Sequence, residues 1–149
     1  MILRGFLIAS LLFLACQMKS FGDDRALAIY DQGDSGKHEK VLLAFVASAQ
    51  AGDASAMLAL SSKNMIARTG GAAKQREIYI NKTIPVLKAF PNIAKSGTER
   101  FGSDDAGHYG WIFTRVFLGA NGQELPLEFT IFREDGVLVV SRFAKAGKR

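Results

Sequence analysis

The stretch Glu124-Leu-Pro-Leu-Glu-Phe-Thr-Ile-Phe-Arg-Glu-Asp-Gly-Val-Leu-Val-Val140 decides the fold, because it predicts two β-strands joined by a tight turn. An Asp-Gly pair between two apolar runs is a strong signal for a two-residue type I′ turn. If Asp135 and Gly136 form that turn, the pairing across the hairpin follows: Glu134 faces Val137, Ile131 faces Val140 and Phe129 faces Arg142.

The strands extend on both sides of this hairpin. The last strand is predicted to run over 137–143, and the β-rich run 109–118 precedes the hairpin, to which it is joined through the turn residues 119–122. A short edge strand is expected over 98–101. Consecutive strands separated by tight turns favour an antiparallel meander.

Helical patterns precede the strands. Apolar residues follow the spacing of one buried helical stripe over 37–51, after which Gly52 ends the helix and Asp53 caps a second, short one over 54–60. A third helical stretch covers 72–89, and Pro85 should kink or restart it, with Thr83 as the new cap. Helices followed by a meander predict an α+β fold in a single domain.

Strand alternation assigns two faces to the sheet. The face under the helices is expected to hold Trp111, Phe113, Arg115, Phe117, Leu125, Leu127, Phe129, Ile131, Leu138, Val140 and Arg142. The outer face then holds Ile112, Thr114, Val116, Leu118, Glu128, Thr130, Phe132, Val137, Val139, Ser141 and Phe143. Since that outer face is too apolar to lie wholly in water, we expect a partner surface, most simply a homodimer through the sheet.

Arg115 and Arg142 are predicted to share the aromatic inner face. An unpaired charge is costly at an apolar site, so each arginine needs a carboxylate, backbone carbonyls, water or a ligand. One interpretation is a pocket for a small anionic or apolar ligand, lined also by Trp111, Phe113 and Tyr79. The alternative is that both arginines extend to the rim of the sheet and into solvent.

The runs 41–54 and 122–140 together resemble the nuclear transport factor two-like superfamily, which includes ketosteroid-isomerase-like and SnoaL-like domains. The resemblance covers 37–143 and implies a cystatin-like cone, in which N-terminal helices pack on a curved antiparallel sheet that encloses a cavity. Members often carry a tryptophan in the strand after the Asp-Gly turn, where this chain has Leu138. Their functions range from isomerases and dehydratases to non-catalytic binding and assembly domains, so the fold alone does not assign one.

Few residues are suited to acid–base chemistry. Asp104, Asp105 and His108 cluster just before the strand 109–118 and form either a catalytic group, a weak metal site or a plain polar loop. His38 stands alone near a helix start and is expected to be exposed. No nucleophile–base pair, phosphate loop or metal-ligand spacing is visible, so the sequence predicts no cofactor and no metal, and it favours a non-catalytic domain over a small cavity enzyme.

The N-terminus resembles an export signal. A short basic start and an apolar run to residue 15 predict a signal peptide too short to span a membrane. Cys16, the only cysteine, lies where a bacterial lipobox has its lipidated residue, although Phe13 stands where leucine is usual. The alternative is ordinary cleavage after Gly22. The predicted organisation is therefore a signal peptide, a tether over 16–36, a domain over 37–144 and a basic tail over 145–149.

These observations predict an exported protein of the periplasm or outer membrane, anchored there by lipid, that binds a small ligand or a partner protein. An assembly or inhibitory module acting through the outer sheet face is a further alternative. The chain carries a formal net charge of +5 but no lysine- or arginine-rich arm, which argues against nucleic acid as a partner. The segment 63–100 is basic, and its positive residues are Lys63, Arg68, Lys74, Arg76, Lys82, Lys88, Lys95 and Arg100.

Overall fold

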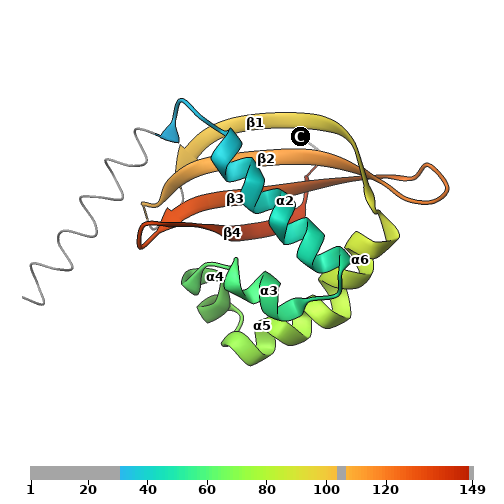
Figure 1. Ribbon diagram of the computed structural model, residues 1–149, viewed down its shortest axis with the longest axis horizontal. Coiled ribbons are helices and arrows are strands. Elements are labelled where there is room, and N and C mark those ends of the chain that lie inside the picture. Colours follow the sequence, from blue (N-terminus) through green and yellow to red (C-terminus); the bar gives the residue numbers. More distant parts are fainter. Residues whose placement is uncertain (1–30, 104–106, 148–149) are drawn as a thin grey trace, which may run out of the picture.

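The computed structural model describes residues 31–103 and 107–147, and in them helices come first and a sheet second (Figure 1). The helices are α2 (Gly36–Gln50), α3 (Ala54–Ala59), α4 (Lys63–Arg68), α5 (Ala72–Ile78), a π-helical turn (Tyr79–Thr83) and α6 (Ile84–Ala89). The strands are β1 (Asn92–Ser103), β2 (Tyr109–Leu118), β3 (Glu124–Glu134) and β4 (Val137–Lys145). They form one antiparallel sheet in that order, so the predicted α+β class is confirmed.

The corner between α2 and α3 follows the predicted signals. Gly52 has a φ of 73°, a value that favours glycine, and it ends α2. Asp53 then caps α3, because its side chain accepts a hydrogen bond from the backbone N–H of Ala56 at 2.9 Å. The short helix α4 was not predicted. Ser62 begins it in the same way, by accepting from the N–H of Met65 at 3.0 Å.

The predicted interruption at Pro85 is present. The helix widens into a π-turn over Tyr79–Thr83, in which the N–H of Ile84 donates to the carbonyl of Tyr79, and α6 starts just before the proline. Near a helix start the missing N–H of proline removes no bond that the helix needs. The predicted cap was wrong, since the side chain of Thr83 makes no capping hydrogen bond and is buried instead.

Both hairpin turns form where the sequence predicted them. Asp135 and Gly136 have φ values of 50° and 79°, as a type I′ turn requires, and Glu134 pairs with Val137. The edge strand is longer than expected, since β1 covers Asn92–Ser103. On the opposite edge, β4 is partly covered: Val140 donates to the carbonyl of Leu60 at 2.7 Å, and its own carbonyl accepts from Ser62 at 2.9 Å.

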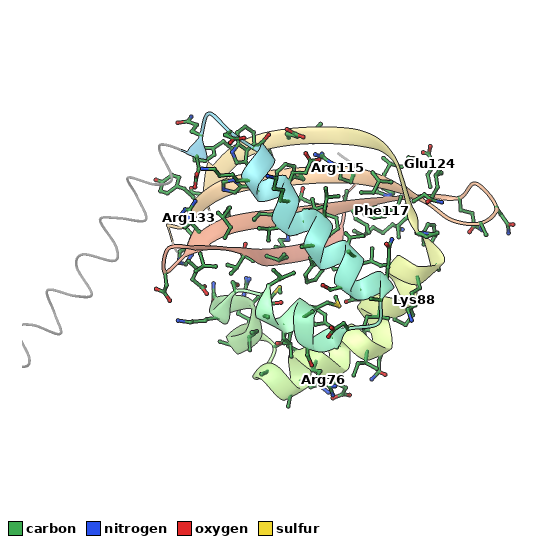
Figure 2. All side chains as sticks on the ribbon, viewed as in Figure 1. Arg76, Lys88, Arg115, Phe117, Glu124 and Arg133 are labelled. Carbon is green, nitrogen blue, oxygen red and sulfur yellow. The ribbon has the colours of Figure 1, made fainter. Side chains whose placement is uncertain are left out.

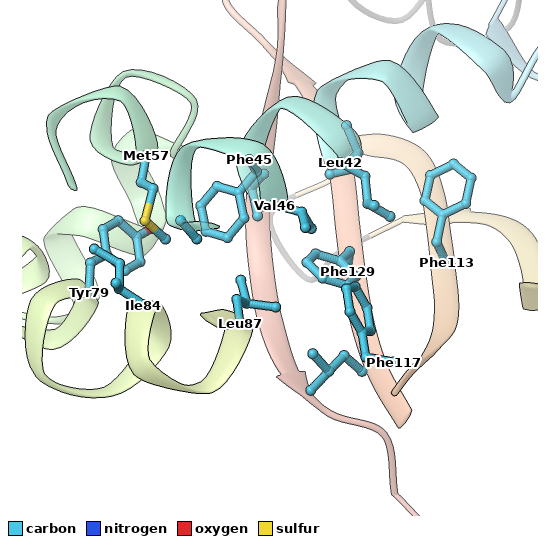
Figure 3. Packing of buried hydrophobic residues seen from close by; sticks show 14 of the residues in the cluster. Leu42, Phe45, Val46, Met57, Tyr79, Ile84, Leu87, Phe113, Phe117 and Phe129 are labelled. Carbon is cyan, nitrogen blue, oxygen red and sulfur yellow. The ribbon is translucent and has the colours of Figure 1, made fainter. Parts of the chain in front are cut away.

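Helix α2 crosses the predicted inner face of the sheet and forms the core with it (Figure 1). Its Phe45 packs edge-on against Phe129 of β3, with ring centroids 6.5 Å apart, and Phe117 of β2 lies 6.1 Å from Phe129 (Figure 3). All three rings are fully buried. Full burial of one such side chain stabilises a fold by roughly 1.5–3 kcal/mol, so this layer holds the helices on the sheet.

A β-bulge in β4 changes the predicted faces. Ile131 pairs with Val140 as expected, but Thr130 then pairs with Arg142, and Ser141 is the extra residue. Phe129 therefore faces Phe143, at a ring-centroid distance of 5.1 Å, and not Arg142. The prediction that Arg142 lies on the inner face and Phe143 on the outer face was wrong, because one inserted residue reverses the alternation beyond it.

Candidate functional site

Arg115 is buried on the inner face, with 1% of its surface exposed (Figure 2). Its Nη2 donates to Glu39 of α2 at 2.8 Å and to Glu99 of β1 at 2.6 Å, and its Nη1 donates to the backbone carbonyl of Thr114. The guanidinium also lies 5.0 Å from the ring centre of Phe113. The predicted need of Arg115 for a partner is thus met by two carboxylates of the chain itself. Their negative charges compensate the charge of the buried guanidinium.

The other residues predicted to line an inner pocket belong to the core. Phe113 is fully buried, and the Nε1 of Trp111 donates to the backbone carbonyl of Asp31 at 3.0 Å. Tyr79 is 2% exposed, and its hydroxyl lies 2.6 Å from the Oγ of Ser61. Burial raises the pKa of Tyr79, and its hydrogen bonds with Ser61 and Gln75 oppose that rise. These contacts are typical of packed core residues.

On the outer face, Arg142 borders a groove of about 540 Å³ that the sequence analysis did not predict. The groove is lined by Asn64, Arg68, Arg100, Ser103, Ile112, Glu128, Thr130, Phe132, Ser141 and Arg142. These side chains come from α4 and from every strand of the sheet described here. Three of them are arginines, and all three are exposed.

The register of the sheet explains how the groove forms. Arg100 pairs with Ile112, Ile112 with Thr130, and Thr130 with Arg142, so these residues form one row across the strands. Neighbouring strands are about 4.8 Å apart, which places the Cα atoms of Arg100 and Arg142 about 14 Å apart at the two ends of the row. Two long cationic side chains therefore flank a floor made by Ile112 and Thr130.

Arg68, in the last turn of α4, is the third arginine of the groove. Arg68, Arg100 and Arg142 together form its positive rim. Its Nη2 donates to the carbonyl of Ser141, the bulge residue, at 3.3 Å. The start of α4 is fixed against the turn between β3 and β4, since the N–H of Lys63 donates to Glu134 at 2.8 Å and its Nζ lies 2.6 Å from Asp135. The short helix thus has contacts with the sheet at both ends.

The groove has an excess of positive charge. Among the described residues that line it there are three arginines and one carboxylate, Glu128, which lies 3.8 Å from the Nη1 of Arg142. Guanidinium groups with free N–H donors bind carboxylates and phosphates strongly, in part because they can form two parallel hydrogen bonds. The arrangement therefore favours an anionic ligand.

The signal for this site was partly present in the sequence. Arg68 and Arg100 lie in the basic segment 63–100, but nothing local shows that they approach Arg142. Of the predicted catalytic residues, Asp104 and Asp105 lie outside the described residues, and His108 is half-buried. Cys16 lies outside them as well. Within residues 31–103 and 107–147, no cluster of three or more His, Cys, Asp or Glu side chains is suited to a metal ion.

A second polar cluster lies where the chain enters the fold. The carboxylate of Asp31 accepts from Nε and Nη2 of Arg133 at 2.9 and 2.6 Å, and Asp31 is only 2% exposed (Figure 2). The end of the predicted tether is therefore fixed to the sheet. His38 beside it was expected to be exposed, yet it is fully buried, and neither ring nitrogen has a hydrogen-bond partner among the described residues. Burial lowers the pKa of His38.

In the part of the chain that the structure describes, every helix is too short or too polar to cross a membrane. Comparisons with protein-family models, with curated proteins and with solved structures found no match for this chain.

Proposed function

We propose that this protein is a binding domain that holds an anionic ligand, without catalysis, in the groove on its outer sheet face. The observation that carries the proposal is the row from Arg100 to Arg142, which places two exposed arginines on either side of one floor, in a groove that Arg68 also lines. A groove of about 540 Å³ lies within the range of small-molecule sites, roughly 300–1,000 Å³.

The proposal includes export and a lipid anchor at Cys16, which would place the domain in the periplasm or on the outer membrane. The apolar run before residue 15 and the position of the single cysteine support it. It also includes the nuclear transport factor two-like cone as the finer description of the fold. The support for that assignment is the order of the elements, with α2 crossing one face of a curved antiparallel meander (Figure 1).

Titration of the mature protein with inorganic phosphate, followed by calorimetry, tests the binding function. Each of the variants Arg100→Gln and Arg142→Gln removes one charged donor from the groove. A charge-assisted hydrogen bond contributes about 1.5–3 kcal/mol, so each variant should weaken binding by roughly tenfold or more.

Arg76→Gln is the matched control, because Arg76 is an exposed arginine on α5 that does not line the groove. It should bind phosphate like the unmodified protein. Absence of phosphate binding, or an equal loss in the control variant, would overturn the proposed function.

A further inference from the structure

The floor of the groove is apolar at two positions that face the same side of the sheet. Ile112 of β2 is 8% exposed and Phe132 of β3 is 3% exposed, and both line the groove. Thr130 lies between them on the floor, since it pairs with Ile112 and precedes Phe132 by two residues. The positive rim and the apolar floor are therefore parts of one surface.

Phe132 is held in place by its neighbour across the sheet. It pairs with Gly110, and a Cβ atom at Gly110 would lie 2.8 Å from Cδ1 of the ring and 2.1 Å from the carbonyl oxygen of Ile131. Only glycine fits there, so the ring lies directly over the β2 backbone. Since only 3% of Phe132 is exposed, the ring adds a small, preformed apolar contact to the floor.

The volume and the charges of the groove limit what it can hold. A bare inorganic anion would leave most of the 540 Å³ to water. Glu128 lies near Arg142 at one end, where its negative charge opposes a second anionic group on the ligand. The site is suited to a molecule with one anionic end and an apolar body.

From these observations we infer that the groove binds an organic anion whose anionic group contacts the arginines and whose apolar part covers Ile112 and Phe132. The inference rests on the proposed function and names the ligand class for the same groove. Since Ile112 and Phe132 are already largely buried, apolar contact adds to the affinity because it removes the apolar surface of the ligand from water. The arginines fix the orientation of the ligand.

A comparison of two probes, inorganic phosphate and phenyl phosphate, tests the inference on the mature protein by calorimetry. Phenyl phosphate should bind at least tenfold more tightly, because only its ring can cover the floor. Ile112→Thr keeps a β-branched side chain, and so suits the strand, but it makes the floor more polar. It should reduce the tenfold difference to about threefold or less.

Val116→Thr is the matched control, since Val116 lies on the outer face of the same strand but does not line the groove. It should keep the full difference between the probes. Equal affinities for the two probes, both reduced by Arg142→Gln, would overturn this inference and leave the proposed function standing. A tenfold preference that Ile112→Thr does not change would also overturn it. No binding of either probe would overturn both.

Discussion

Thr130 pairs with Arg142 across β3 and β4, and the extra residue Ser141 separates that pair from the pair of Ile131 with Val140. The bulge has two consequences. It directs Arg142 to the outer face, in one row with Arg100, and it directs Phe143 to the core, against Phe129. The bulge thus places Arg142 in the groove and Phe143 against the core.

Deletion of Ser141 should leave a regular ladder in which Thr130 still pairs with Arg142. The faces of the strand would not change, so the expected loss of stability is about 1 kcal/mol, from the hydrogen bonds that Ser141 makes. Deletion of Phe143 is the control, and loss of a half-buried phenylalanine ring that packs on the core should cost about 2–3 kcal/mol, below the range for a fully buried ring. Urea unfolding measures both, and equal losses for the two deletions would contradict the assignment of the bulge.

The two carboxylates that hold Arg115 should act together. Glu39→Gln or Glu99→Gln alone leaves one carboxylate on the guanidinium, so each should cost about 1 kcal/mol. The double variant leaves a buried cation without a carboxylate, for which the expected cost is about 3–5 kcal/mol, more than the sum of the two. A double-mutant cycle in urea measures this coupling.

Glu77→Gln provides the control for that cycle. Glu77 pairs with Lys74 at 2.8 Å, but both side chains are 56% exposed, so the variant should change stability by less than about 1 kcal/mol. If the two losses at Arg115 were additive and as small as this one, the ion pairs around Arg115 would not contribute to holding α2 on the sheet.

His38 predicts a loss of stability in acid. Its ordinary pKa is 6.5, and burial lowers the pKa in the folded protein; Asp31 opposes this effect and Arg133 adds to it. Because the unfolded chain binds the proton more readily, stability is fully present above pH 6.5 and falls as the pH drops below that value toward the folded pKa. Below the folded pKa this group causes no further loss.

Urea midpoints between pH 8 and pH 5 measure this effect, together with NMR titration of the two histidines in the chain. His38→Met should reduce the dependence on pH over this range. A His38 that titrates at or above 6.5 in the folded protein would show that burial does not control it.

Gly110 should not accept a side chain. A Cβ atom there would meet the carbonyl oxygen of Ile131 and the ring of Phe132, at distances that real Cβ atoms do not reach. Gly110→Ala should therefore cost about 3 kcal/mol, because β2 and β3 would have to separate. Gly147→Ala meets nothing within 4 Å and should be neutral within about 0.5 kcal/mol. Thermal unfolding compares the two.

Signals that act over a few residues made the fold predictable. Asp135 and Gly136 define the turn by their own backbone preferences, so the pairs next to it were predicted correctly as far as Ile131 and Val140. Beyond that pair the prediction was wrong, because nothing in the sequence marks Ser141 as an inserted residue. Regular alternation without that insertion places Arg142 on the inner face, which explains why only Arg142, among the three groove arginines, was named as a site residue, and on the wrong face.

Contacts between distant residues account for the other differences. Asp31 and Arg133 are 102 positions apart, and their ion pair fixes the chain before α2. Both charges act on His38. Local composition around Asp31 resembles a tether, and it carries no sign of that contact. Likewise α4 has only six residues, too few for a periodic pattern, although it supplies Arg68 to the groove.

NMR of the arginine Nε–H groups, recorded as phenyl phosphate is added, tests the central claim most directly. Arg68, Arg100 and Arg142 should shift together with one dissociation constant, because all three line the groove. Arg115 and Arg133 should not shift, since carboxylates of the chain already hold them. Shifts confined to Arg115 and Arg133, or the absence of any shift in the three groove arginines, would contradict the account.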